Sequence, residues 1–301
     1  MADRIDAHHH LWRYDAEHYG WIDDRMSALR RDYLAAEFGG ELKSEHITGS
    51  VLVQVQQSLE ETDWLLSQAS ASEWIRGVVG WAPISSPEFP GILRRLCHQD
   101  KLRGLRHIVQ DEPDERFILR PDFNRGIAAM TGSGLVYEIL IYERHLPLAI
   151  EFVSRHPGQV FVLDHLAKPR VRERELDPWR ARLTELARHE NVWCKLSGLV
   201  TEADWQRWTV NDLHPYFNVA LDAFGPRRLM AGSDWPVCLL ASSYARWWET
   251  VHELLGQLSE EDRDAILGKN AVEVYRLQSR PESAPTTTHV QTASEIRRPT
   301  R

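Results

Sequence analysis

Eight short apolar segments rich in β-branched residues recur along the chain, and helical patterns lie between them. The apolar segments cover residues 4–8, 50–56, 76–82, 102–109, 134–141, 159–166, 191–198 and 227–235. They are almost continuously apolar, as expected of strands whose two faces are both buried. Helical patterns occupy residues 58–69, 144–158, 177–190, 212–225 and 259–267, and less clearly 34–46, 88–98 and 121–131.

This alternation predicts a single-domain (β/α)8 TIM barrel over residues 1–278, because the number and length of the units match that fold. A doubly wound open sheet has a similar element order. It usually carries a glycine-rich phosphate loop after its first strand, and none follows residues 4–8. Residues 279–301 are rich in Pro, Thr and Ser and lack periodicity, which predicts a disordered tail.

Three local patterns predict where helices begin. Ser58 with Glu61, and Ser259 with Asp262, have the spacing of a capping box. Asp177 followed by a proline predicts a helix with Asp177 as N-cap and the proline at its first position.

The composition limits the partners and the compartment. The net charge is −8 and the sequence pI is about 6.0, which argues against nucleic acid and anionic membranes as partners. Three scattered cysteines do not form a disulfide framework and fit a reducing cytoplasm. The chain shows no secretory signal and no apolar run long enough to span a bilayer. The oligomeric state is left open.

Three consecutive histidines, residues 8–10, stand at the end of the first predicted strand. Strand geometry places His8 and His10 on one face and His9 on the other. In a (β/α)8 barrel, chemistry belongs at the C-terminal ends of the strands. Polar residues recur near those ends: His8, His10, Gln54, Gln56, Arg106, His107, Tyr137, Glu138, Asp164, His165, Lys168, Lys195, Ser197, Ser233 and Asp234. A buried polar group left unpaired costs roughly 1–3 kcal/mol, so such a ring indicates a site.

Four motifs carry a resemblance to a known family. They are "DAHHHLW" (6–12), "DHLAKP" (164–169), "GSDWPVC" (232–238) and "GKNAVEVYRL" (268–277). They resemble the amidohydrolase superfamily, and more narrowly its branch of sugar lactonases, typified by L-fuconolactonase and L-rhamnonolactonase. The likeness runs from about residue 3 to residue 277.

The resemblance implies a catalytic set of His8, His10, His165 and Asp234. The same four residues would hold one divalent metal ion such as Zn²⁺, or the enzyme would work without a metal. Binuclear members need a histidine on the fifth strand, and residues 134–141 have none; His145 comes later, in the next helix. At most one metal ion is therefore expected.

The function implied is hydrolysis of a small sugar-derived aldonolactone, of the L-fucono, L-galactono or L-rhamnono type, to the sugar acid in sugar catabolism. Asp234 is the expected general base that activates water. Three kinds of side chain would bind the substrate. The cations are Arg106, Lys168 and Lys195, and the hydrogen-bonding partners for sugar hydroxyls are Gln56, His107 and Tyr137. The apolar surfaces are Trp12 and Trp235, with Trp81 as a further candidate.

Two other functions are left open. One is a metal-dependent decarboxylase or hydrolase of an aromatic or pyrone carboxylic acid from the same superfamily. A dicarboxylate substrate would call for several arginines in the pocket, and only Arg106 stands well placed at a strand end. The other is a catalytically dead barrel that serves as a binding protein.

Overall fold

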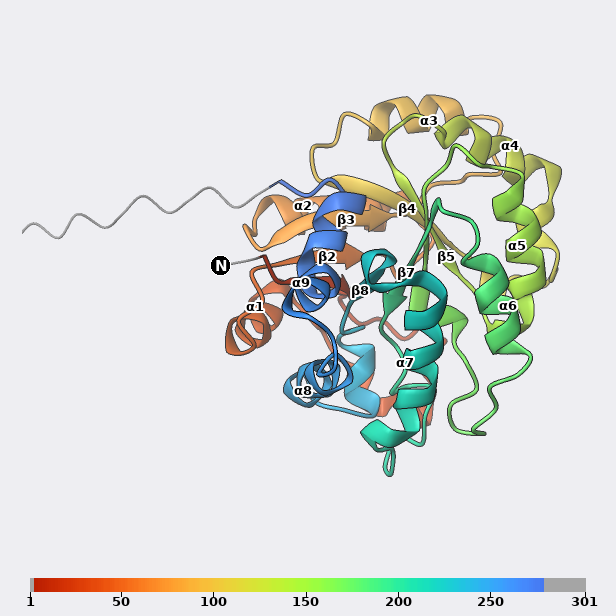
Figure 1. The fold of residues 1–301 in the computed structure, drawn as a ribbon. Coiled ribbons are helices and arrows are strands. Elements are labelled where there is room, and N and C mark those ends of the chain that lie inside the picture. The colour runs from red at the N-terminus through yellow and green to blue at the C-terminus, as the bar shows by residue number, and fades with distance from the viewer. Residues whose placement is uncertain (1–2, 279–301) are drawn as a thin grey trace, which may run out of the picture.

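The computed structural model describes residues 3–278, and the predicted tail lies outside them. Eight parallel strands form one sheet in sequence order, which confirms the predicted barrel (Figure 1). They are β1 Ile5–His9, β2 Gly49–Val53, β3 Ile75–Gly80, β4 Leu102–Ile108, β5 Val136–Leu140, β6 Phe161–Leu163, β7 Val192–Leu196 and β8 Leu229–Ala231. Each overlaps a predicted segment, and most are shorter; Asp164, Ser197 and Asp234 lie beyond the ends of β6, β7 and β8.

The barrel is closed between β8 and β1 by the segment that follows β8. The amide of Asp234 donates to the carbonyl of His8 at 2.8 Å, and the amide of His10 donates to the carbonyl of Trp235 at 2.6 Å. The Asp6 carboxylate accepts hydrogen bonds from the amide of Ser233 at 2.8 Å and from the Tyr244 hydroxyl at 3.1 Å. This closure brings the histidines of β1 beside Asp234.

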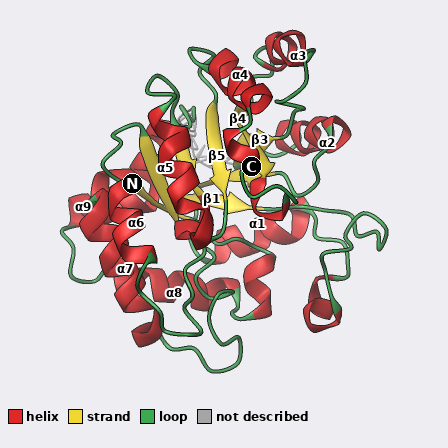
Figure 2. Cartoon of the chain, turned by 90° about the vertical axis from the view of Figure 1, so that its right-hand side faces the viewer, coloured by secondary structure: helices red, strands yellow, loops and turns green. Residues whose placement is uncertain are grey.

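Helices surround the strands, as Figure 2 shows. They are α1 Ala35–Ser44, α2 Leu59–Ser70, α3 Phe89–Leu96, α4 Pro121–Met130, α5 Leu146–Ser154, α6 Trp179–Leu186, α7 Val210–Phe224, α8 Tyr244–Leu254, α9 Glu260–Asp264 and α10 Asn270–Val274. Helix α8 was not predicted, although Ser243 caps it and its buried face includes Trp247, Trp248 and Val251. Among residues 3–278, none of the helices is long and apolar enough to cross a membrane.

The predicted helix starts are partly wrong. Ser58 caps α2 by accepting a hydrogen bond from the amide of Glu61, but the Glu61 carboxylate does not complete the box. It accepts instead from the amides of Val55 and Gln56, which holds the loop after β2 against the helix. Asp177, in contrast to Ser58, is not an N-cap, since α6 begins at Trp179 and the Asp177 carboxylate pairs with Arg180.

The side chains inside the barrel change from apolar to charged along the strands. A cluster of strand side chains, among them Val136 and Val162, packs against Tyr275 just after α10. The Tyr275 hydroxyl donates to the Glu138 carboxylate, and Glu138 in turn contacts Lys195 on β7. The apolar layer therefore gives way to a buried layer of charge, and the histidine cluster lies beyond that layer.

Candidate active site

A cavity of about 380 Å³ lies at the C-terminal ends of the strands. Loops that follow β1, β2, β4, β5, β6, β7 and β8 all contribute to its wall. The polar lining residues are His10, Arg106, Gln110, Asp111, Tyr142, His165, Lys168, Thr201, Glu202 and Asp234. Trp12, Trp21 and Trp205 supply aromatic surface to the same cavity. This is where a (β/α)8 barrel places its chemistry.

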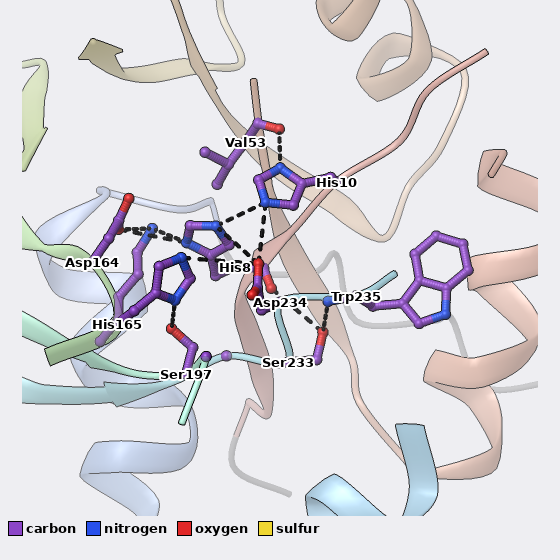
Figure 3. Close-up of polar contacts among 12 residues, drawn as sticks. His8, His10, Val53, Asp164, His165, Ser197, Ser233, Asp234 and Trp235 are labelled. Carbon is purple, nitrogen blue, oxygen red and sulfur yellow. Dashed lines mark hydrogen bonds and ion pairs between the residues drawn. The ribbon is translucent and has the colours of Figure 1, made fainter. Parts of the chain in front are cut away.

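Three imidazoles surround one carboxylate oxygen at the wall of this cavity (Figure 3). Oδ1 of Asp234 lies 3.2 Å from Nε2 of His10, 3.7 Å from Nε2 of His8 and 3.9 Å from Nε2 of His165. Nε2 of His8 and Nε2 of His10 are 3.1 Å apart. Residues from β1, the loop after β6 and the loop after β8 thus converge on a single oxygen atom.

Strained backbone positions two of these side chains. His165, Leu166, Ala167 and Lys168 all have positive φ, between 50° and 58°, and Asp234 has φ of 59°. Non-glycine residues rarely adopt this left-handed conformation, which costs roughly 1–2 kcal/mol for each residue. The left-handed turn brings both His165 and Lys168 to the cavity wall, so the strain is concentrated at the site.

Gly198 allows the His165 ring to sit where it does. A Cβ atom on Gly198 would lie 2.6 Å from Nδ1 of His165, and the glycine itself has φ of 68°. The same ring nitrogen is held by the hydroxyl of Ser197 at 2.9 Å.

A buried charge network supports the cluster from inside the barrel. Nζ of Lys195 lies 2.6 Å from Oε1 of Glu138, 3.1 Å from Oδ1 of Asp164 and 2.9 Å from Nδ1 of His8. Arg106 donates to Oδ2 of Asp164 at 2.9 Å. All five side chains are almost completely excluded from solvent. Such a network is stable only with every partner present, because an unpaired buried charge is costly.

The environment sets the charge states of the cluster. Burial lowers the pKa of His165 to about 4, although Asp234 and Asp164 oppose the change. Burial and the neighbouring Lys195 hold the pKa of His8 well below its usual value. Burial alone would raise the pKa of Asp234, but His165, His10 and Lys168 outweigh it, and the pKa falls below its usual value. At neutral pH the site therefore pairs an ionised aspartate with neutral His8 and His165.

Two hydrogen-bond partners define the tautomers of the first-strand histidines. Nδ1 of His10 faces the carbonyl oxygen of Val53 at 2.8 Å and so carries a proton. Nδ1 of His8 faces the ammonium of Lys195, which can only donate, so neutral His8 carries its proton on Nε2. The Nε2–H of His8 then points toward His10 and Asp234.

The donor set fits one metal ion. Nε2 of His8, Nε2 of His10 and Oδ1 of Asp234 are separated by 3.1, 3.2 and 3.7 Å, near the spacing of about 3.3 Å between ligands of tetrahedral zinc. Binding through Nε2 of His8 requires its proton to move to Nδ1, which removes the hydrogen bond that Lys195 donates there and turns Nδ1 into a donor 3.5 Å from Oδ1 of Asp164. A second group, His8, Asp164 and His165, shares His8 with the first. The two groups are therefore alternatives rather than a binuclear pair.

The predicted site residues fall into three places. His10, His165, Asp234, Trp12, Arg106 and Lys168 line the cavity. His8 and Lys195 lie behind the wall, with no solvent exposure. Gln56, His107, Tyr137 and Trp235 are not among the lining residues. Trp12 is itself fully buried, and its indole donates to the carbonyl of Arg31.

Three of the residues outside the cavity pack against the helical layer. The His107 ring stacks on Phe117 with centroids 4.6 Å apart. Tyr137 packs against Phe123 and other aromatic residues on the same side of the sheet. The Trp235 indole stacks on Phe38 of α1 and points away from the histidines in Figure 3.

Several residues in or behind the cavity were given no role by the sequence reasoning. Asp164 stands directly before His165 in a predicted strand, and its position at a strand end was the available signal. Asp6, which ties β1 to the loop after β8, belongs to the first motif but was not assigned. The loop residues Trp21, Gln110, Asp111, Tyr142, Thr201, Glu202 and Trp205 gave no signal, because nothing local marks a loop residue as facing a cavity.

A parallel eight-stranded barrel with a His-x-His pair at the end of β1, a histidine after β6 and an aspartate after β8 has the arrangement of a (β/α)8 enzyme with its reactive groups at the strand ends. The sequence profile of the Amidohydrolase family matches residues 5–277, and the chain belongs to this family. The resemblance found in the sequence motifs is thereby confirmed, and the protein is an enzyme of the hydrolase class.

Similar proteins cover nearly the whole chain. It is 42% identical to L-fucono-1,5-lactonase of Burkholderia multivorans, covering 94% of this chain and 98% of the relative. It is 34% identical to L-fucono-1,5-lactonase of Burkholderia ambifaria, covering 92% and 97%. Crystal structures of an amidohydrolase from Burkholderia multivorans, 41% identical, match with TM-scores of 0.89 with bound HEPES and 0.87 with bound Zn, each covering 92% of this chain and 100% of that one.

Proposed function

We propose that the protein hydrolyses a sugar-derived aldonolactone of the L-fucono, L-galactono or L-rhamnono type to the sugar acid. Two relatives with lactonase names, 42% and 34% identical, support the reaction class. The observation that carries the proposal is the ionised Asp234 carboxylate, which lies in the cavity with three imidazoles within 3.9 Å of Oδ1. A base surrounded by hydrogen-bond donors and acceptors is what attack by water on an ester carbonyl needs.

Asp234 is the general base in this mechanism. Its lowered pKa keeps it ionised at neutral pH, so it can accept a proton from a water molecule in the cavity. The water oxygen forms a bond to the lactone carbonyl carbon, and the ring C–O bond then breaks. The proton returns from Asp234 to the departing ring oxygen, which leaves the open-chain hydroxy acid.

Cationic and neutral donors stabilise the negative charge that develops on the carbonyl oxygen. Lys168 and Arg106 both line the cavity, and Nε of Arg106 is buried without a hydrogen-bond partner among residues 3–278. His165 contributes a neutral ring at the same wall. Preorganised donors of this kind stabilise a tetrahedral intermediate because they need no rearrangement during the reaction.

Lys195 has a different role from the one the sequence suggested. It is fully buried and absent from the cavity wall, so we assign it to orienting His8 rather than to binding substrate. A zinc ion held by His8, His10 and Asp234 would add Lewis-acid polarisation of the carbonyl.

The charge of the cavity favours a neutral substrate over an aromatic or pyrone dicarboxylate. Arg106 and Lys168 are the cations among the lining residues, and Asp111, Glu202 and Asp234 are the acids. Bidentate recognition of two carboxylates would call for more arginines. The family assignment likewise disfavours a catalytically dead barrel. The cytoplasmic location stays a prediction.

The test is a panel of aldonolactones assayed with a pH indicator, with and without chelator. Asp234→Asn should lower turnover by roughly 10²–10⁴-fold while the fold survives, since it removes the proton acceptor and keeps the shape. The matched control is Asp222→Asn, an exposed aspartate on α7. If Asp234→Asn retains near-normal turnover on the best lactone, the base lies elsewhere.

A further inference from the structure

The loop after β7 holds Glu202 firmly at the cavity wall. Its carbonyl oxygen accepts a hydrogen bond from the amide of Arg172 at 3.0 Å. Its neighbours Thr201 and Trp205 are joined by a hydrogen bond from the Trp205 indole to the Thr201 carbonyl at 2.8 Å. Thr201, Glu202 and Trp205 all line the cavity. The backbone of Glu202 is therefore held in place by hydrogen bonds, and Trp205 is an aromatic neighbour on the same wall.

The Glu202 carboxylate is partly buried and accepts no hydrogen bond and forms no ion pair among residues 3–278. Burial raises its pKa, and the charge of Lys168, which lines the same cavity, opposes that rise. Gln110, from the loop after β4, lines the same cavity, and its Oε1 is buried without a hydrogen-bond partner in the described chain. Gln110 Oε1 is thus an acceptor withdrawn from water without a donor, and Glu202 presents to the cavity a carboxylate that accepts no hydrogen bond from the described residues, so the cavity suits a ligand that brings donors.

We propose that Glu202, assisted by Gln110, is the specificity-determining residue that accepts hydrogen bonds from the hydroxyl groups of the lactone. This inference rests on the proposed lactonase function. A carboxylate accepts charge-assisted hydrogen bonds, which are roughly twice as strong as neutral ones. A polyol presents several hydroxyl donors. Trp205, held by its own hydrogen bond, offers an apolar surface for the C–H face of the sugar.

The negative charge of Glu202 has a second effect, on the product. Hydrolysis converts a neutral lactone into an aldonate anion within the same cavity. Glu202 and Asp111 both line it, and like charges beside low-dielectric protein repel each other more strongly than in bulk water. Glu202 thus selects neutral substrate over anionic product and promotes product release.

The test compares wild type with Glu202→Gln and Glu202→Asp on the best lactone and on a deoxy analogue that lacks one hydroxyl. For Glu202→Gln we expect KM for the hydroxylated lactone to rise about 5–10-fold with kcat little changed, because ground-state binding is lost. The increase should be smaller for the deoxy analogue that lacks the hydroxyl bound by Glu202. The inhibition constant of the aldonate product should fall, since its repulsion is removed.

Glu202→Asp shortens the side chain but keeps its charge. KM for the lactone should therefore rise, while the inhibition constant of the product stays near that of wild type. The matched control is Glu185→Gln, which removes an exposed carboxylate on α6 that lines neither this cavity nor the adjoining one and should leave KM and product inhibition unchanged. If Glu202→Gln binds lactone and product as wild type does, the inference is overturned while the lactonase function stands. If wild type hydrolyses no lactone, the proposed function itself fails, and this inference fails with it.

Discussion

Replacing Gly198 with alanine should displace the His165 ring without touching any charge. The new Cβ would lie 2.6 Å from Nδ1, 2.8 Å from Cγ and 2.9 Å from Cβ of His165. Ordinary contact begins near 3.4 Å, so the ring has to move by about 0.8 Å, the difference between 3.4 and 2.6 Å. This movement also stretches the hydrogen bond between His165 and Ser197, now 2.9 Å long.

The expected cost has two parts that a control can separate. Alanine at φ of 68° is strained by about 1 kcal/mol, whatever surrounds it. Gly225 has a similar φ of 66°, with ψ of 168°, but a Cβ there meets nothing within 4 Å. Gly225→Ala therefore carries the backbone strain alone, and Gly198→Ala carries the strain together with the ring displacement.

Displacing a catalytic group by about 1 Å can cost on the order of 10²-fold in rate. We expect kcat/KM of Gly198→Ala to fall about 10–100-fold and that of Gly225→Ala to stay within twofold of wild type. Initial rates with the best lactone, and urea unfolding of all three proteins, provide the measurements. Equal activity of the two variants would show that the position of His165 does not limit catalysis.

Three further outcomes are expected. Lys195→Met should lower the free energy of unfolding by about 3–5 kcal/mol, because it removes the ammonium that Glu138 and Asp164 share and leaves these buried carboxylates with only Tyr275 and Arg106 as donors. Urea denaturation near neutral pH measures this, and a loss below about 1 kcal/mol would contradict it. The kcat/KM of wild type should be flat from about pH 5 to pH 8 and fall only below about pH 4. Above that pH, Asp234 stays ionised because its pKa is lowered, and His165 stays neutral because its pKa is about 4. An apparent pKa between about 6 and 7 in the pH profile would assign the base to another group. Metal analysis of protein purified without added zinc should find at most one equivalent, and chelation should lower activity only in part; two tightly bound equivalents would reveal a missed ligand.

The sequence was sufficient for the barrel because the signal is repeated eight times. Each strand is an apolar run, and each run alternates with a helical pattern, so an error at a single element did not change the predicted fold. Missing α8 and misplacing the start of α6 left the fold prediction intact. The four motif residues His8, His10, His165 and Asp234 could also be found, since they stand at strand ends along the chain.

Outside the histidine run of residues 8–10, the sequence did not reveal which face of a strand each residue occupies. Both faces of these strands are buried, so the apolar pattern has no visible alternation and gives no phase. Arg106 and Glu138 face the barrel interior, whereas their neighbours His107 and Tyr137 pack against the helices. One position along the strand separates a charged residue of the interior network from an aromatic packing residue.

The sequence by itself therefore determined the architecture and identified polar residues that the structure brings together at the strand ends, because both follow from local patterns of residue type. The tertiary structure decided how deeply each polar side chain is buried and which residues it contacts. Lys195 lies within β7 and contacts Glu138, Asp164 and His8, whereas Lys168 follows β6 and reaches the cavity through a left-handed turn. These contacts join residues far apart in the chain, such as His8 and Lys195, and only closure of the barrel brings them within hydrogen-bond distance.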